Sequence, residues 1–414
     1  MKGRSSSWQG ETRSTRQPRA FQLRQYLMTP PLRALALVAI ACLLSGYSAP
    51  ALPARPHGYA VVAELSAGRG ALAGSDFGSA VALSNGTAAI GAAGAKRLYI
   101  FSQVDGHWRH VATFSGPGAF TGTLFGNGVA ISGNTIAVAA PAMSPTERRA
   151  GNVVLFSRNA GHWTESSIFR GRDGPFGTFV AMSGGVLAVS DTKCVYIYTK
   201  AVTGWRQSTI VPTPATTSGI PDIVSVSGHM VAFGDPSYDR GLGRVIVLSK
   251  TGTGWVATAD LSPPRPRYGQ QFGSDLSISG DRLAVSTYPT GGRATVYPFT
   301  KRGRSWVPAG ALLPPNTSLT NASAITGSIA LYKTTLSFGT LNTAVTSTGI
   351  PYAYGAAYIF EHSSTGWHQQ QRVVSGGRTF DEFGSAIALD GNDLVVGAPN
   401  IDRARGRVFV FERP

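Results

Sequence analysis

Residues 383–411 read FGSAIALDGNDLVVGAPNIDRARGRVFVF, and this stretch decides the fold. A Phe-Gly pair opens it, and an alternating apolar run leads to a tight Asp-Gly turn at 390–391. A second apolar run, a polar loop and a third run at 408–411 follow. Apolar alternation with a period of two, interrupted by Gly and Asp, is typical of β-strands. The stretch therefore predicts three short strands joined by turns.

Weaker copies of this unit fill the chain back to about Phe77. Aligned on the Phe-Gly pair and on the turn seven residues later, the copies start at 77, 125, 176, 220, 272, about 326 and 383. The copies at 220 and near 326 have lost the Phe-Gly pair but keep the register. Seven units of this length predict an all-β fold, a seven-bladed β-propeller with four strands in each blade.

A fourth strand is expected after the third in six of the seven units, and each one opens at a tryptophan. These tryptophans are Trp108, Trp163, Trp205, Trp255, Trp306 and Trp367. The last unit ends at Pro414, where its fourth strand should begin, whereas residues 59–65 read YAVVAEL and look like a fourth strand. We therefore predict that the N-terminal strand completes the last blade and closes the ring, which leaves no long open sheet edge.

The repeat resembles a known family. Each unit has Phe-Gly, then Gly-Ala-Pro or a relative of it (at 91–93, 139–141, 234–236 and 397–399), then a G-x-V-x-V-F pattern, and this resembles the FG-GAP repeat. The resemblance covers roughly residues 59–414. It implies the seven-bladed propeller of integrin alpha subunits and of many bacterial envelope or secreted proteins. It also implies that partners bind on the face that carries the loops between blades.

The N-terminus has the pattern of a secretory signal peptide over residues 1–51. A basic segment precedes an apolar run at 34–47, and an Ala-Pro-Ala sequence at 49–51 offers a cleavage site. The run is too short for a transmembrane helix, which needs about 20 apolar residues. Residues 1–27 would precede the true start if translation begins at Met28. An uncleaved anchor and a lipoprotein cysteine at Cys42 are the alternatives, and each still predicts a secreted, periplasmic or cell-envelope location.

Residues 52–414 are predicted to form one propeller domain. The full chain has a formal net charge of +16, of which +6 belongs to residues 1–51 because seven basic residues there face one acidic residue. The remaining +10 favours anionic partners. Cys194 is the one cysteine beyond residue 51 and is interpreted as a small buried hydrophobe. An insert at 342–355 predicts a longer surface loop on the sixth blade.

The sequence predicts neither a metal site nor a catalytic site, and no cofactor. The calcium-binding members of the family carry several acidic residues in the first hairpin of a blade, whereas here only the last such hairpin has two, Asp390 and Asp393. These hairpins are better interpreted as two-residue turns. The metalloprotease, nucleophile-elbow and P-loop motifs are absent from the sequence, so we predict a protein that is not an enzyme. Nucleic acid is not an expected partner either.

Arginines gather in the loops between second and third strands and in the loops between blades. The candidate ligand-binding residues are Arg148, Arg149, Arg240, Arg244, Arg265, Arg267, Arg403, Arg405 and Arg407. In a propeller these loops share one face, and the two-pronged guanidinium suits carboxylates and phosphates. We therefore predict an anionic glycan or protein ligand. Lys200, Lys250 and Lys301 make the other face basic as well, so a generally basic, solvated surface is the competing interpretation.

Three functional hypotheses follow. The first is an exported, non-catalytic binding or adhesion protein that recognises an anionic ligand through its arginine-bearing face. The second is a lectin whose aromatic side chains stack on sugars between blades, although packing against the neighbouring blade is the favoured role for the tryptophans. The third is a secreted enzyme that acts on polysaccharide. Anion binding through arginines should weaken steeply with salt, whereas stacking on a neutral sugar should not.

Overall fold

A computed structural model describes the propeller, which belongs to a compact unit at Pro56–Pro414. The described residues are 58–117, 123–142, 150–172, 174–213, 223–289, 294–313, 328–345, 351–376 and 380–414. The expected signal peptide at 1–51, with its apolar run, Met28 and Cys42, lies outside them. So does the start of the single domain predicted at 52–414.

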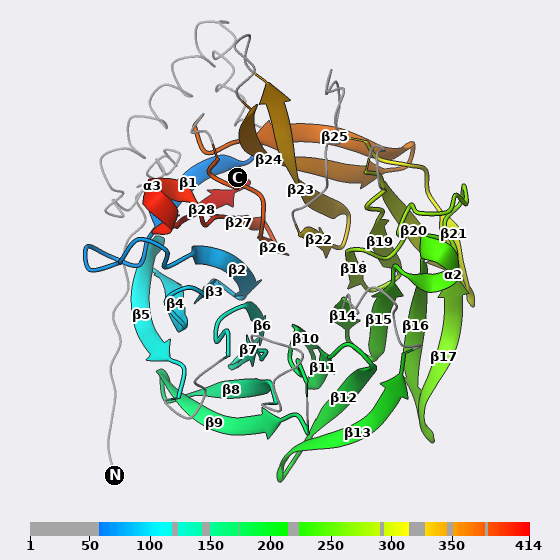
Figure 1. Ribbon diagram of the computed structural model, residues 1–414, viewed down its shortest axis with the longest axis horizontal. Helices are drawn as coiled ribbons and strands as arrows, with labels where there is room; N and C mark the ends of the chain where they lie inside the picture. The colour runs from blue at the N-terminus through cyan, green and yellow to red at the C-terminus, as the bar shows by residue number, and fades with distance from the viewer. Residues whose placement is uncertain are drawn as a thin grey trace, which may run out of the picture. The chain divides into compact units, whose positions relative to one another are not determined.

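Seven four-stranded antiparallel sheets form a ring in the described part of the chain, which confirms the seven-bladed propeller (Figure 1). Blades one and two are β2 (Phe77–Ser84), β3 (Thr87–Ala92), β4 (Arg97–Val104) and β5 (His107–Ser115), then β6 (Gly128–Ser132), β7 (Thr135–Ala140), β8 (Asn152–Asn159) and β9 (His162–Arg170). Blades three and four are β10 (Phe179–Ser183), β11 (Val186–Ser190), β12 (Cys194–Ala201) and β13 (Gly204–Pro212), then β14 (Val224–Ser227), β15 (Met230–Asp235), β16 (Arg244–Thr251) and β17 (Gly254–Leu261).

The remaining blades follow the same order. Blades five and six are β18 (Leu276–Ser279), β19 (Arg282–Ser286), β20 (Val296–Arg302) and β21 (Ser305–Pro308), then β22 (Ile329–Tyr332), β23 (Thr335–Val345), β24 (Pro351–Ser363) and β25 (Gly366–Val373). Blade seven combines β26 (Ile387–Asp390), β27 (Asp393–Ala398) and β28 (Arg407–Glu412) with β1 (Ala60–Leu65) from the other end of the propeller. The described part also contains two short helical turns, α2 (Tyr238–Gly241) and α3 (Ile401–Ala404).

The N-terminal strand closes the ring, as the sequence predicts. β1 pairs antiparallel with β28 from Val61 opposite Phe411 to Leu65 opposite Val408, with a bulge near the start. The side-chain amide of Gln371 in blade six also donates to the Tyr59 carbonyl oxygen (2.8 Å). Pairing removes the free edges that blade seven and the N-terminal segment would otherwise present to solvent.

Apolar layers between adjacent blades make the core. The phenylalanine of every Phe-Gly pair is fully buried, and the rings are those of Phe77, Phe125, Phe176, Phe272 and Phe383. The tryptophans that open the fourth strands pack against these layers, with Trp163 and Trp306 buried and the others partly buried. In the layer between blades one and two, Trp163 shares a cluster with Leu98 and Ile100 of the preceding blade. The favoured packing role of the tryptophans agrees with these positions.

Short side chains link the inner strands around the ring. The last residue of an inner strand, a serine in blades one to five, accepts a hydrogen bond from the backbone N–H of the next blade's hairpin turn. The bonds join Gly133 to Ser84, Gly184 to Ser132, Gly228 to Ser183, Gly280 to Ser227 and Lys333 to Ser279, at 2.9–3.2 Å. At ring closure the Asp390 carboxylate accepts from the N–H of Asn85 (2.6 Å). These bonds fix the rotation of each blade against its neighbour.

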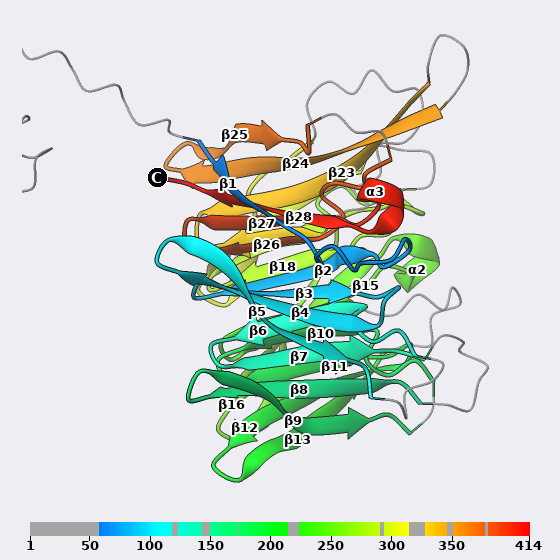
Figure 2. The ribbon, with the colours of Figure 1, turned by 90° about the vertical axis from the view of Figure 1, so that its left-hand side faces the viewer.

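The insert of the sixth blade differs from the expected loop. β23 and β24 stay paired through most of it, up to Val345 opposite Pro351, so 342–345 and 351–355 form an extended hairpin. The described part of this hairpin projects on the same side of the ring as α2 and α3 (Figure 2).

Candidate anion-binding site

The loops between second and third strands and the loops between blades open on the side of the ring that carries α2 and α3 (Figure 2). Both helical turns contain three successive residues with positive φ, which are Asp239, Arg240 and Gly241 in α2 and Asp402, Arg403 and Ala404 in α3. Non-glycine residues hold this conformation only where neighbours compensate for it. Here the backbone N–H groups of the next blade's loop compensate by donating to the turn's carbonyl oxygens.

The nine arginines predicted from the sequence fall into separate groups. Arg148 and Arg149 lie outside the described residues. Arg240 and Arg244 lie on α2 and β16 of blade four, and Arg265 and Arg267 lie on the loop that leads from blade four to blade five. Arg403, Arg405 and Arg407 belong to α3 and β28 of blade seven, which is far from α2 around the ring (Figure 1).

Three of the described arginines in this set form internal ion pairs, and the pair between Arg240 and Asp239 (3.7 Å) is exposed to solvent. The other two arginines are Arg244 and Arg407. Nε of Arg244 lies 3.2 Å from Oδ2 of the buried Asp235, and one of its terminal nitrogens lies 3.5 Å from Asp260. The Arg244 guanidinium also lies 4.0 Å from the centroid of the Tyr238 ring. Arg407 pairs with Asp402 (2.7 Å) and with Glu64 of β1. Both arginines thus join a blade's third strand to its fourth and have less capacity to bind a ligand.

The arginines of the inter-blade loop line a hollow. Arg265 and Arg267 are exposed, and with Gln270, Thr287 and Tyr297 they line a pocket of about 220 Å³. Gln270 is only 8% exposed, and its amide nitrogen is buried without a hydrogen-bond partner in the described part of the chain. A buried donor of this kind is normally satisfied. The pocket therefore offers two guanidinium groups to an oxygen-bearing ligand, and the Gln270 amide nitrogen lies buried behind its wall.

Three exposed tyrosines lie on the loops that border this pocket. Tyr238, Tyr268 and Tyr288 are 42%, 63% and 45% exposed. The Arg240 guanidinium lies 4.5 Å from the centroid of the Tyr268 ring, and the N–H of Tyr288 donates to the Gln270 carbonyl oxygen. Tyrosine and arginine are the residue types enriched at binding hot spots. We call this group the tyrosine–arginine site, and its members are Tyr238, Arg240, Arg265, Arg267, Tyr268, Gln270 and Tyr288.

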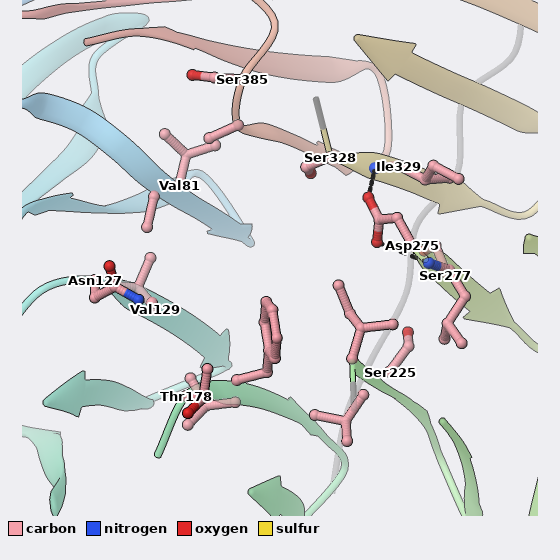
Figure 3. Close-up of a pocket in the computed structure, with 18 of the residues that line it drawn as sticks. Val81, Asn127, Val129, Thr178, Ser225, Asp275, Ser277, Ser328, Ile329 and Ser385 are labelled. Carbon is pink, nitrogen blue, oxygen red and sulfur yellow. Dashed lines mark hydrogen bonds between the residues drawn. The ribbon is translucent and has the colours of Figure 1, made fainter. Parts of the chain in front are cut away.

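A second cavity lies at the centre of the ring. It measures about 310 Å³ and is lined by the inner-strand segments of all seven blades (Figure 3). Hydroxyl and amide side chains such as Asn127, Thr178 and Ser328 alternate there with apolar ones such as Val81 and Val129. The lining of the central cavity is therefore a mixture of polar and apolar side chains.

One partly buried acid stands out in the lining of the central cavity, and the sequence analysis missed it. The carboxylate of Asp275 accepts hydrogen bonds from the N–H of Leu276 (2.7 Å) and from the N–H of Ile329 (2.8 Å) in the next blade. Desolvation raises the pKa of Asp275 to about 7, although the two N–H donors act in the opposite direction. Asp275 therefore links blade five to blade six. The sequence did contain a signal for Asp275. The other blades carry Ala, Gly, Phe, Ile or Ser at the equivalent inner-strand position, so an acid there is exceptional.

Acidic side chains do not converge in the way a cation site requires. Within the described ranges, no group of three or more His, Cys, Asp or Glu residues is placed to hold a metal ion. The one hairpin with two acids uses Asp390 to accept from Asn85, while burial and the charges of Glu412 and Asp390 raise the pKa of Asp393 to about 6. Over the same ranges, no helix is both long and apolar enough to cross a membrane.

Comparison with known proteins agrees with this architecture. Residues 367–411 match the model of the FG-GAP repeat, and the chain is an FG-GAP-like seven-bladed propeller. A chain of the mitotic checkpoint complex is similar in structure, with a TM-score of 0.54 at 13% identity over 89% of this chain and 98% of that one. A protein from Lactobacillus plantarum (TM-score 0.47, 12% identity, 74% and 85% covered) and Sqt1 of Saccharomyces cerevisiae (0.45, 10%, 86% and 99%) also match. No curated protein matches in sequence. At these identities the likeness shows the fold alone.

Proposed function

We propose that this protein is an exported, non-catalytic binding propeller that holds an acidic glycan at the tyrosine–arginine site. The observation that carries the proposal is the pocket that Arg265 and Arg267 line together with Gln270, whose buried amide nitrogen has no hydrogen-bond partner among the described residues. Export is proposed from the signal-like pattern of residues 1–51.

The chemistry of the pocket favours a carboxylate-bearing sugar. A guanidinium group can donate two parallel hydrogen bonds to one carboxylate, and charged hydrogen bonds of this kind are stronger than neutral ones. Exposed tyrosine rings offer flat apolar surfaces, and a sugar can stack on such a surface while the acid group is held beside it. The surplus positive charge of the propeller also attracts an acidic polymer.

The lectin hypothesis must now rest on different residues. The tryptophans pack into the layers between blades, so a neutral sugar would have to stack on Tyr238, Tyr268 or Tyr288 instead. These rings lie on α2 and on the loops that contribute the pocket's lining, and salt separates the two hypotheses. Acidic-glycan binding through arginine weakens as ionic strength rises, whereas stacking on a neutral sugar changes little.

A glycan-array screen at low and high salt tests the proposal with a matched pair of variants. We expect the purified protein to bind acidic glycans at low salt, and Arg265→Ala/Arg267→Ala to lose at least tenfold in affinity. Arg403→Ala/Arg405→Ala removes the same charge from the α3 turn of blade seven and should leave binding within about twofold.

The remaining outcomes contradict the proposal in distinct ways. Equal loss in both double variants would show a generally basic surface. Salt-resistant binding of neutral sugars would favour the lectin. The absence of glycan binding at either salt concentration would leave a protein partner as the ligand.

A further inference from the structure

A large hollow lies on the opposite side of the ring, where the hairpins of blades five and six meet. It measures about 650 Å³, and its lining includes Asp281, Arg282, Lys301, Tyr332 and Lys333. Asp281 and Arg282 come from the first hairpin of blade five, Lys301 from β20 of the same blade, and Lys333 from the first hairpin turn of blade six. Three cations and one acid therefore face the same space.

The Arg282 side chain lies over the ring of Trp367 in blade six. Its guanidinium carbon lies 6.0 Å from the centroid of the Trp367 ring, and its Nη1 atom is buried without a hydrogen-bond partner in the described part of the chain. The nearby imidazole of His362 adds no further positive charge. Burial and the charge of Arg282 lower the pKa of His362, which keeps that ring neutral at physiological pH. Arg282 thus contributes a fixed positive charge to the lining of the hollow.

The two lysines also lack carboxylate partners among the described residues. Nζ of Lys301 lies 3.8 Å from the Met230 sulfur, which is only a weak acceptor. Nζ of Lys333 lies 5.2 Å from the centroid of the Tyr332 ring. Asp281 is the only acid in the lining, so the hollow has a surplus of two positive charges.

The propeller's own repeats show that this arrangement is local. Lys200, Lys250 and Lys301 occupy one position of the third strand, each opposite the tryptophan of the fourth. At the position of Arg282, however, blades three and four have Val186 and Met230. At the position of Lys333, the blades that follow them have Gly228 and Gly280. The three cations coincide at the junction of blades five and six because two repeat positions have changed there.

We propose that this hollow is a second anion site, built for a phosphate group. Three cations against one acid favour a ligand with more than one negative charge. A phosphate monoester carries nearly two charges at neutral pH and has three oxygens that accept hydrogen bonds. The site lies on the far side of the ring from the tyrosine–arginine site, so the two can be tested independently.

Calorimetric titration with inorganic phosphate, with acetate as the singly charged comparison, tests this site. We expect phosphate to bind more tightly than acetate. Lys301→Met keeps the chain length, and Lys333→Asn suits the positive φ of 51° at this position; each should weaken phosphate binding roughly five- to tenfold. Lys250→Met removes the equivalent charge from blade four and should change nothing. Asp281→Asn should tighten binding, because it removes the repulsive carboxylate.

Other outcomes either overturn the proposal or identify the source of the phosphate. Equal loss in Lys250→Met, or no tightening in Asp281→Asn, would contradict it, as would the absence of phosphate binding to the unmodified protein. Arg265→Ala/Arg267→Ala should bind phosphate normally even if the tyrosine–arginine site proves inert. Binding of glucose 6-phosphate would assign the site to phosphorylated saccharides, whereas binding of phosphatidic acid vesicles that is lost in Lys301→Met would assign it to a lipid headgroup that carries a phosphate monoester.

Discussion

The α2 turn (residues 238–244) and the α3 turn (residues 401–407) are built on one plan. They read YDRGLGR and IDRARGR, and both pass through left-handed backbone at the Asp-Arg pair. In both, the arginine carbonyl accepts from a glycine N–H of the next blade's loop, Gly269 to Arg240 (3.2 Å) and Gly74 to Arg403 (3.1 Å). These bonds also align the two inter-blade loops residue by residue.

The aligned loops differ in the side chains that face the turns. Gly70 and Leu72 occupy the places of Arg265 and Arg267, so the loop beside α3 lacks the two charges. Over the described ranges, the buried amide nitrogen of Gln270 has no hydrogen-bond partner, whereas its counterpart Ser75 donates its hydroxyl to the Leu72 carbonyl oxygen. The repeat therefore sets the backbone contacts between blades, and three side chains of one loop turn a satisfied junction into a candidate binding site.

The largest expected effect is a loss of stability when the glycine before the last arginine of either turn is replaced, and it should be equal at both turns. Gly243 and Gly406 have φ of 79° and 81°, and an added Cβ would lie 2.1 Å and 2.0 Å from the carbonyl oxygens of Phe272 and Phe77. Those backbones carry fully buried rings and cannot shift. We expect Gly243→Ala and Gly406→Ala each to lower the free energy of unfolding by about 3 kcal/mol or more, measured by urea denaturation. Gly252→Ala, in open space, is the control; a tolerated Gly406→Ala would contradict the shared plan.

Both turns end in an arginine, but removing it should reduce stability by different amounts in the two turns. Arg244 is 14% exposed and pairs with the buried Asp235, whereas Arg407 is 34% exposed and pairs with the solvent-accessible Asp402. Removing one partner of a buried pair leaves a charge uncompensated, while an exposed pair contributes little. We expect Arg244→Ala to lose about 3 kcal/mol of stability and Arg407→Ala less than about 1 kcal/mol, by the midpoint of urea unfolding.

The exposed Arg240→Ala in the same turn as Arg244 serves as the control and should not alter the midpoint. Equal losses for Arg244→Ala and Arg407→Ala would mean that the shared sequence, and not burial, decides the role of the arginine.

The fold was predictable because the repeat carries its own register. Phe-Gly pairs in five units, turns seven residues later and a tryptophan at six of the seven fourth strands are local signals, and together they place every blade. The last unit lacks a fourth strand of its own, and this gap made the role of the N-terminal strand predictable. The inner-strand serines were visible at a fixed position before the turn, but their hydrogen bonds to the next blade depend on how adjacent blades are rotated. A sequence pattern does not contain that rotation.

The site was predictable only in part. Arginine-bearing loops could be placed on one side of the ring, but Arg244 and Arg407 look as available in the sequence as Arg265 and Arg267. Their acids lie on other strands, and only the fold brings them within reach. Gln270 had no signal at all, because an uncharged residue becomes significant only when its amide is buried without a partner.

The smallest expected effect is a pH-dependent loss of stability at the junction beside α3, which the junction beside α2 should not show. Asp76 precedes Phe77 beside the α3 turn, and its counterpart beside α2 is the neutral Gln271. Burial raises the pKa of Asp76, so the folded state holds its proton to a higher pH than the unfolded state does. The unfolding free energy therefore falls as pH rises from the ordinary carboxyl pKa of about 4 through the raised value, and stays lower above it. We expect Asp76→Asn to stabilise the protein by less than about 1 kcal/mol at pH 7.5, because the side chain keeps part of its solvent.

The pH dependence of this gain distinguishes charge from backbone. The gain of Asp76→Asn should disappear below pH 4, where the carboxyl is protonated in both states, and urea midpoints at pH 7.5 and below pH 4 measure it. Gln271→Asn is the matched control, since both positions have positive φ (55° and 53°) that asparagine tolerates better than most residues. Any backbone gain in the control should be equal at both pH values. A gain for Asp76→Asn that is also equal at both would mean that its carboxylate carries no penalty, and that the two junctions differ only in the side chains of their loops.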